Sequence, residues 1–264
     1  MPYNFKPSTL FIGKKIIFLP SCHSTNDELV KMIPETGGDS TLEGTVVVTD
    51  QQTAGRGQRG NRWEAEPGQN LTFSLLLKPT FLQASAQFDL SIAIALGVYE
   101  ALGEHLDENQ LRIKWPNDLY HLHPAEGNQK LGGLLIENTL QGYQVSTAIV
   151  GIGLNINQLI FPVPQATSLR RITGQPFSYD LERLLARLLE CLEAEYLRLR
   201  QGGQQAQKAR YLARLFRYQE WHPYRSNGRL FNAQLLGVDE TGCLALETTG
   251  GLRYFGIKEV EFVI

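Results

Sequence analysis

The sequence predicts an α+β fold in which a large mixed domain is followed by a small β domain. Two observations predict it. Runs of β-branched and apolar residues alternate with helical patterns along most of the chain, as at residues 45–49 and 181–199. After a second helical stretch, the pattern changes to short strand-like runs separated by turn sequences. We therefore expect one domain over residues 1–220 and a small β-barrel domain over residues 221–264.

The elements of the large domain follow from local composition. Ser24, with Asp27 three residues later, predicts the capped start of a short helix. Small and apolar residues over 88–102 predict a buried helix, and leucines at helical spacing predict an amphipathic helix over 181–199. A further helix is expected at 204–217. Apolar and β-branched runs predict the strands, at residues 16–19, 45–49, 71–77, 111–115, 131–137 and 143–152.

The last part of the chain carries turn chemistry. Three strand-like runs within residues 229–264 are separated by the sequences at 239–242 and 248–251, which are rich in Asp, Thr and Gly. This pattern predicts the small β-barrel.

Composition limits the class of protein. The chain has 264 residues, of which 42% are hydrophobic and 20% charged, as in an ordinary soluble globular protein. A net charge of −2 gives no reason to expect nucleic acid as a partner. Three scattered cysteines without zinc-ligand spacing favour a reduced, cytoplasmic setting. We expect no signal peptide and no membrane partner, because the sequence has no long apolar run.

Residues 51–63, which we call the Gly/Arg loop, combine glycines with arginines. The glycines allow tight turns and close approach to a ligand, and Arg56, Arg59 and Arg62 carry forked donors suited to phosphate oxygens. A solvated basic turn explains the loop equally well, because it matches neither a Walker motif nor a dinucleotide fingerprint. Trp63 could stack on a base or lie in the core.

The segment Arg112–Tyr120 is a strand that ends in polar residues. Proline at position 116 cannot continue a ladder, so the strand ends there. Lys114 and Asp118 at this end are candidates for phosphate contact and Mg²⁺ coordination. An ordinary Asn-Asp turn is the alternative.

Two further strands contain glycines. Gly132 and Gly133 weaken the strand that follows Lys130, which usually marks close approach of a ligand or another backbone. Lys130 could neutralise a carboxylate or a phosphoryl group there, or be a surface lysine. In the strand around Gly151, Asn155 could donate to and accept from an adenine edge, although a plain edge strand is the alternative.

In their order along the chain, these motifs resemble the biotin–protein ligase (holocarboxylase synthetase) family. The resemblance rests on Ser24-Thr25-Asn26, the Gly/Arg loop, Lys114–Asp118, Lys130 with its Gly-Gly strand, and Gly151–Asn155, and it extends over about residues 18–157. It implies a catalytic domain related to class II aminoacyl-tRNA synthetases and lipoate ligases, with a mixed sheet, flanking helices and a C-terminal barrel. The implied reaction activates biotin with ATP to biotinyl-5'-AMP. The biotinyl group then passes to a lysine of a biotin carboxyl carrier domain, usually that of acetyl-CoA carboxylase.

The resemblance also implies roles for residues. The biotin head would be bound by hydroxyl and amide side chains, which suit a ureido ring, namely Ser24, Thr25, Asn26 and Gln52. The ring and tail of biotin would lie along Gly132 and Gly133, with Lys130 at the carboxylate. Lys130, Arg56 and Lys114 would offset charge during catalysis, while Asp118 would help to hold Mg²⁺. The nucleotide or adenylate would be contacted by Arg56, Gly57, Gln58, Arg59, Trp63, Lys114, Asn117 and Asn155.

One position departs from the family pattern, and two alternatives stay open. The family often has arginine where this chain has Gln58, so retention of the adenylate would rest more on Arg56 or Arg59.

Members that repress transcription carry an N-terminal DNA-binding domain. Because the ligase motifs begin at Ser24 here, we expect none, and we expect a monomer or homodimer. A lipoate–protein ligase is the nearest other enzyme, although the Gly/Arg loop favours biotin. A non-enzymatic vitamin-binding module would leave the phosphate-suited residues without a purpose.

Overall fold

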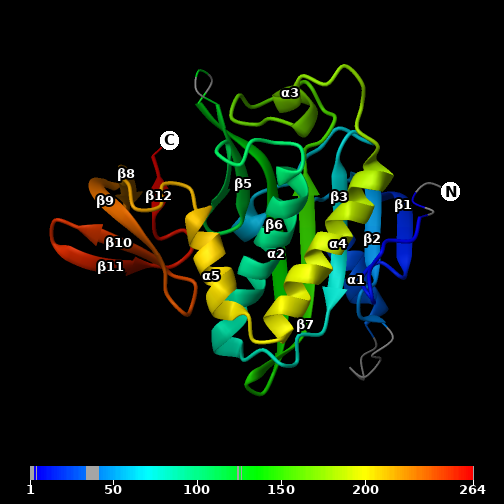
Figure 1. Ribbon diagram of the computed structural model, residues 1–264, viewed down its shortest axis with the longest axis horizontal. Helices are drawn as coiled ribbons and strands as arrows, with labels where there is room; N and C mark the ends of the chain where they lie inside the picture. The colour runs from blue at the N-terminus through cyan, green and yellow to red at the C-terminus, as the bar shows by residue number, and fades with distance from the viewer. Residues whose placement is uncertain (1–2, 4, 34–41, 124, 126, 264) are drawn as a thin grey trace.

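The chain forms two β-sheets, of which the first carries most of the helices (Figure 1). The computed structural model describes residues 3, 5–33, 42–123, 125 and 127–263. The side chain of Arg59 also lies outside what the structure describes.

The first sheet has seven strands in the order β1-β2-β3-β7-β6-β5-β4. Its β1–β2 pair is parallel and all other pairs are antiparallel, so the sheet is mixed. Strands β6 and β7 are joined through Gly142, whose φ of +60° favours glycine. In chain order the strands are β1 (Ile16–Cys22), β2 (Val46–Gln52), β3 (Leu71–Leu77), β4 (Leu111–Lys114), β5 (Asp118–His123), β6 (Gly127–Gln141) and β7 (Gln144–Leu154).

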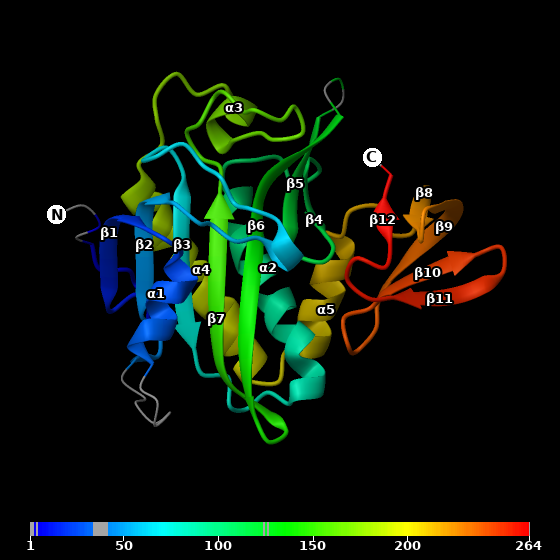
Figure 2. The same ribbon diagram turned by 180° about the vertical axis from the view of Figure 1, so that it is seen from behind.

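Helices cover the two faces of this sheet unequally. Helices α2 (Gln87–Gly103) and α4 (Leu181–Arg200) lie on one face, with α5 (Gln204–Ala213) beside α2 (Figure 1). Of the described residues, the opposite face carries the short α1 (Thr25–Met32) and the segment between β2 and β3 (Figure 2). That second face is therefore the one left open for a ligand.

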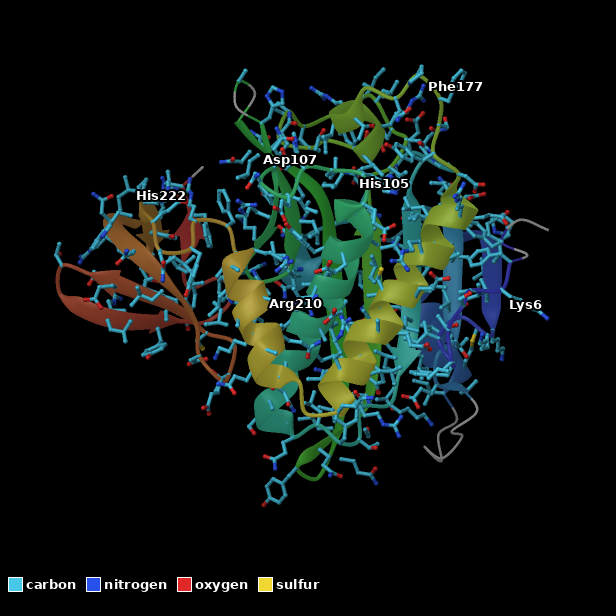
Figure 3. The ribbon with its side chains drawn as sticks, viewed as in Figure 1. Lys6, His105, Asp107, Phe177, Arg210 and His222 are labelled. Atoms are coloured by element: carbon cyan, nitrogen blue, oxygen red, sulfur yellow. The ribbon has the colours of Figure 1, made fainter. Side chains whose placement is uncertain are left out.

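An ion-pair cluster fixes α5 to its neighbours. Arg210 of α5 lies 2.9 Å from Glu100 of α2 and 2.9 Å from Glu195 of α4, and Figure 3 labels it on α5. The Glu195 carboxylate is buried, so it needs these partners to offset its desolvation. A short helix, α3 (Leu169–Thr173), lies in the long connection between β7 and α4.

The C-terminal residues form a five-stranded antiparallel sheet in the order β11-β10-β9-β8-β12. Within the described residues, β11 and β12 are its two edges, so the predicted small β domain is present as an open sheet and no closed barrel is formed. A strand as short as β12 leaves little backbone to close a barrel. The strands are β8 (Trp221–Ser226), β9 (Arg229–Val238), β10 (Leu244–Thr248), β11 (Gly251–Phe255) and β12 (Glu261–Phe262). The domain boundary after residue 220 stays a prediction.

Most of the predicted strands and helices are confirmed, and the exceptions have identifiable causes. The predicted helix at 204–217 ends at Ala213, because the chain then pairs with β4, where Ile113 donates to the Arg214 carbonyl. Strands β5 and β8 were missed, β5 because it follows directly on the turn after Pro116 and β8 because Pro223 interrupts its apolar pattern. Ser24 does occupy the N-cap of α1, but its side chain makes no capping hydrogen bond.

Candidate active site

Two rows of residues on the open face of the first sheet carry the site. Antiparallel pairing aligns Thr72 of β3, Gly153 of β7, Gly133 of β6 and Asp118 of β5 in one row. The next row contains Ser74, Gly151 and Leu135. Side chains two residues apart on a strand point to the same face, so both rows share one surface. Above them lies a cavity of about 700 Å³.

One end of the cavity contains a chain of amide and hydroxyl groups from β2, α1 and β3. The Gln52 Oε1 atom accepts from the Thr25 backbone N–H at 2.7 Å and lies 3.1 Å from Thr25 Oγ1. Thr25 Oγ1 lies 2.6 Å from Ser74 Oγ, which donates to Asn26 Oδ1 at 2.5 Å. Ser24 lines the cavity beside them. The network fixes the orientation of each amide, so this end offers set donors and acceptors to a polar ring.

The network continues to the Gly/Arg loop. Asn26 Nδ2 donates to Glu137 Oε2 at 2.6 Å, and the same oxygen accepts from Arg56 Nη2 at 3.0 Å. Arg56 Nη2 also lies 2.7 Å from Asp27 Oδ1 of α1. The first arginine of the loop is therefore held by two carboxylates.

Trp63, at the end of the loop, lies on the row that contains Gly153. A Cβ on Gly153 would be 2.5 Å from the indole ring, so only glycine allows this contact. The indole Nε1 donates to Thr72 Oγ1 at 3.1 Å. In the next row, a Cβ on Gly151 would be 2.6 Å from Asn26 Oδ1. The glycines thus make room for Trp63 and Asn26 on the sheet.

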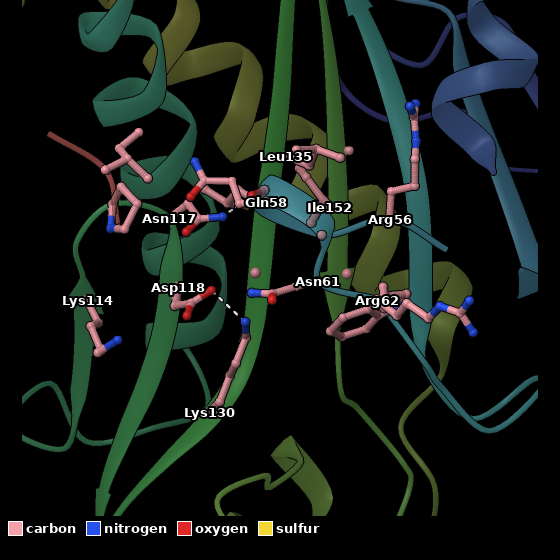
Figure 4. A pocket seen from close by; sticks show the side chains of 18 of the residues that line it. Arg56, Gln58, Asn61, Arg62, Lys114, Asn117, Asp118, Lys130, Leu135 and Ile152 are labelled. Atoms are coloured by element: carbon pink, nitrogen blue, oxygen red, sulfur yellow. Dashed lines mark hydrogen bonds and ion pairs between the residues drawn. The ribbon is translucent and has the colours of Figure 1, made fainter. Parts of the chain in front are cut away.

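The other end of the cavity is cationic. Lys130 Nζ lies 2.6 Å from Asp118 Oδ1, and Figure 4 shows both side chains between the strands that carry them. Lys114 lines the same end, with its Nζ 5.1 Å from the centre of the Tyr120 ring and 5.0 Å from that of Phe262. Burial between these rings lowers the pKa of the Lys114 amino group. Phe262 belongs to β12, so the C-terminal sheet completes this end of the cavity.

Comparison with known proteins identifies the family. A model of the biotin/lipoate A/B protein ligase family matches residues 21–155. The bifunctional ligase/repressor BirA of Bacillus subtilis is 30% identical over 98% of this chain and 77% of its own length. The chain belongs to the biotin/lipoate A/B protein ligase family. A biotin–[acetyl-CoA-carboxylase] ligase of Paracoccus denitrificans is 30% identical over 90% of this chain and 97% of its own length. The structure of a biotin protein ligase from Aquifex aeolicus in complex with biotin and ATP superposes with a TM-score of 0.73, at 27% identity, over 94% of this chain and 98% of the other.

In this member of the biotin/lipoate ligase family, most of the residues predicted from the sequence line one cavity. They are Ser24, Thr25, Asn26, Gln52, Arg56, Gly57, Gln58, Trp63, Lys114, Asn117, Asp118, Lys130 and Gly133. The three predicted catalytic cations are nevertheless not together. Arg56 lies on the α1 side of the cavity, across from Lys114 and Lys130 (Figure 4).

Two predicted residues lie outside the lining, and a third cannot be placed. A Cβ on Gly132 would be 2.6 Å from the Gly153 carbonyl oxygen, so this glycine serves contact between strands rather than contact with a ligand. Asn155 is buried, and its Nδ2 donates to the Thr167 carbonyl at 3.0 Å. Its contact with adenine stays a prediction. The side chain of Arg59 is outside the described residues.

Sequence reasoning missed four residues that hold the site together, namely Thr72, Ser74, Glu137 and Phe262. Thr72 and Ser74 had a signal, since they are polar residues two apart in an otherwise apolar strand. Glu137 ends the predicted strand that begins at Leu131, but its partners are remote in sequence. Phe262 reaches the cavity only through the packing of the second sheet, which no local pattern predicts.

Two classes of feature are not found in the part of the chain that the structure describes. No group of three or more His, Cys, Asp or Glu side chains there is arranged to hold a metal ion. No helix among these residues combines the length and apolar character needed to cross a membrane.

Proposed function

We propose that this protein is a biotin–protein ligase. It activates biotin with ATP to biotinyl-5'-AMP and transfers the biotinyl group to a lysine of the biotin carboxyl carrier domain of acetyl-CoA carboxylase. One observation carries the proposal: a single cavity joins an oriented amide and hydroxyl end to a cationic end along the same face of one sheet. That arrangement suits an acid with a polar head and a carboxylate that must meet a nucleotide.

The biotin head binds at the end formed by Ser24, Thr25, Asn26 and Gln52. Because Gln52 Oε1 already accepts from Thr25, its Nε2 is the group left to donate to a ureido carbonyl. The apolar ring and tail then pass over Leu135 and Gly133, which line the cavity between its two ends. This path brings the carboxylate to Lys130.

At the cationic end, the biotin carboxylate attacks the α-phosphorus of ATP and pyrophosphate leaves. Lys130 and Lys114 offset the charge on the carboxylate and phosphates, so the protein contributes positioning and electrostatic stabilisation. An amine from the carrier lysine then attacks the acyl carbon, and AMP leaves. Asn117 is fixed beside this end, because its Nδ2 donates to the Leu134 carbonyl.

We also propose that Asp118 takes part in holding Mg²⁺ that arrives with ATP. Magnesium in nucleotide sites is commonly held by one or two carboxylates together with phosphate oxygens. Asp118 fits this pattern, since it is a single carboxylate at the cationic end whose Oδ1 contacts Lys130. Magnesium there would supply further positive charge to the phosphates.

The Gly/Arg loop is the segment that would cover the bound adenylate. Arg56, Gly57, Gln58 and Trp63 line the cavity, and movement of this segment over a bound adenylate would shield the mixed anhydride from water. The Trp63 ring lies against Gly153 with its N–H bound to Thr72, and it lines the cavity. We propose that this ring, together with Asn155 and Arg59, contacts the nucleotide.

Measurement of ATP–pyrophosphate exchange with biotin and with lipoate tests the proposal. We expect exchange that depends on biotin, and transfer of biotin to a carrier domain only when ATP is present. Exchange with lipoate alone would support a lipoate ligase. Biotin binding that ATP does not affect, without transfer, would support the vitamin-binding module. We further propose a cytoplasmic monomer or homodimer, which the three free cysteines are consistent with.

A further inference from the structure

We propose that Glu137 is a positioning residue that couples the biotin-head end of the cavity to the Gly/Arg loop. The inference rests on the proposed function, because it assigns Glu137 a role at that same site. Glu137 lies on β6, two residues beyond Leu135, and on the same face of the sheet. It therefore borders the cavity without being one of its lining residues.

The geometry places one carboxylate oxygen between two functional groups. Glu137 Oε2 accepts from Asn26 Nδ2 at 2.6 Å and from Arg56 Nη2 at 3.0 Å. Asn26 belongs to α1, and Arg56 belongs to the loop that follows β2. A single atom of β6 thus ties together two segments that are distant in sequence.

Glu137 decides which way the Asn26 amide faces. Asn26 Oδ1 accepts from Ser74 Oγ at 2.5 Å, and its Nδ2 donates to Glu137, so both ends of the amide are assigned. An ionised carboxylate can only accept, so the Nδ2 end must face Glu137. Without that acceptor the amide could turn over, and it would then present the wrong polarity to the head of the ligand.

The same carboxylate holds the loop. Arg56 is placed between Glu137 and Asp27, at 3.0 Å and 2.7 Å, on the α1 side of the cavity (Figure 4). Contacts with two carboxylates hold one guanidinium, which keeps this part of the loop against α1. Because the Asn26 amide shares the oxygen, removal of the Glu137 side chain releases the loop and the head residue together.

The test compares Glu137→Ala and Glu137→Gln with the control Glu104→Gln. Glu104 pairs with Arg187 at 2.7 Å and has a side chain 44% exposed, against 40% for Glu137, but it lies outside the cavity. The first readout is the rate of trypsin cleavage after Arg56 in the ligand-free protein, followed by mass spectrometry. The second is the KM for biotin and the kcat in pyrophosphate exchange.

We expect Glu137→Ala to raise the cleavage rate and the KM for biotin about tenfold each, as for the loss of a hydrogen bond to a charged group, with a smaller change in kcat. Glu137→Gln should also speed cleavage, because the charge that holds Arg56 is gone. Its amide oxygen can still accept from Asn26, so its KM should stay near that of the wild-type protein. Glu104→Gln should alter neither readout. A merely structural role would change kcat and KM together and would show no rescue by glutamine.

The proposal is overturned if either readout of Glu137→Ala stays at the wild-type value. Should Glu137→Ala fail to fold, Glu137→Gln decides, and an unchanged cleavage rate in that variant overturns the proposal. The cleavage assay contains no ligand, so it tests the contact with the loop by itself. A wild-type protein without biotin-dependent exchange would instead refute the proposed function.

Discussion

Replacing Lys130 by alanine should abolish most adenylation while leaving the fold intact. The Lys130 side chain is 37% exposed and its partner is Asp118, 2.6 Å away. An ion pair this open to water contributes about 1 kcal/mol or less to the free energy of unfolding. The thermal stability of the variant should therefore stay close to that of the wild-type protein.

The catalytic loss follows from the position of the charge. A lysine about 4 Å from a developing negative charge contributes about 4 kcal/mol at an effective dielectric constant of about 20. Water reaches part of this side chain, so we discount that figure to about 2–3 kcal/mol. This corresponds to a decrease in kcat/KM of about 10²-fold, which agrees with the loss of one positioned electrostatic donor.

The assay is biotin-dependent ATP–pyrophosphate exchange, with Lys31→Ala as the control. Lys31 is also an exposed lysine in an ion pair, 2.7 Å from Glu28, but it does not line the cavity. Lys31→Ala should retain wild-type exchange. A Lys130→Ala variant within about fivefold of wild type, or one that unfolds, would refute the reasoning.

Three further perturbations test other parts of the site. Phe262→Ala should admit water to Lys114 and raise the lowered pKa of its amino group toward the ordinary value. The alkaline limb of the pH profile of adenylation should then move to higher pH, and an unmoved limb would contradict this. Gly153→Ala should displace the Trp63 ring, which its Cβ would approach to 2.5 Å, and weaken binding of a nucleotide analogue about tenfold in calorimetry. Gly242→Ala should lower the free energy of unfolding in urea by about 2–4 kcal/mol, because Gly242 has a φ of +87° and its Cβ would lie 2.4 Å from a phenylalanine ring of α2; wild-type stability would contradict this.

The sequence predicted those parts of the fold that depend on local pattern. Strand β3 was predicted with its observed bounds, Leu71–Leu77, because its apolar run is continuous and is bounded by polar residues. The C-terminal β domain was predicted as a small barrel, and its open edges were not predictable, since closure depends on which strands pair and strand-like runs say nothing about pairing. The early end of α5 at Ala213 likewise depends on a contact with β4 that lies outside the helix itself.

Site residues could be predicted where a sequence motif specified both the residue types and their order along the chain. Lys130 and Asp118 are twelve residues apart, and antiparallel pairing of their strands brings them into contact, as their assignment to one site requires. The position of Arg56 was not predictable, because it depends on Asp27 and Glu137, which hold it away from Lys130. Glycines within a strand did not show which of them approaches a ligand and which approaches another backbone. Gly133 faces the cavity, whereas its neighbour Gly132 meets an adjacent strand, since successive residues of a strand face opposite sides.

The two rows across the sheet determine what length of ligand the cavity can accept. From β3, which carries Ser74 of the polar end, to β6, which carries Lys130, there are two strand-to-strand spacings, about 10 Å in total. Backbone hydrogen bonds fix this separation, so rotation of side chains changes it little. If the acid is activated at Lys130 as we propose, it must span from the polar end to this lysine, and a shorter acid bound at the polar end would leave its carboxylate out of reach. Under the proposed function, the sheet therefore sets the length of acid that can be activated, while the role of the Gly/Arg loop is to cover the adenylate once it has formed.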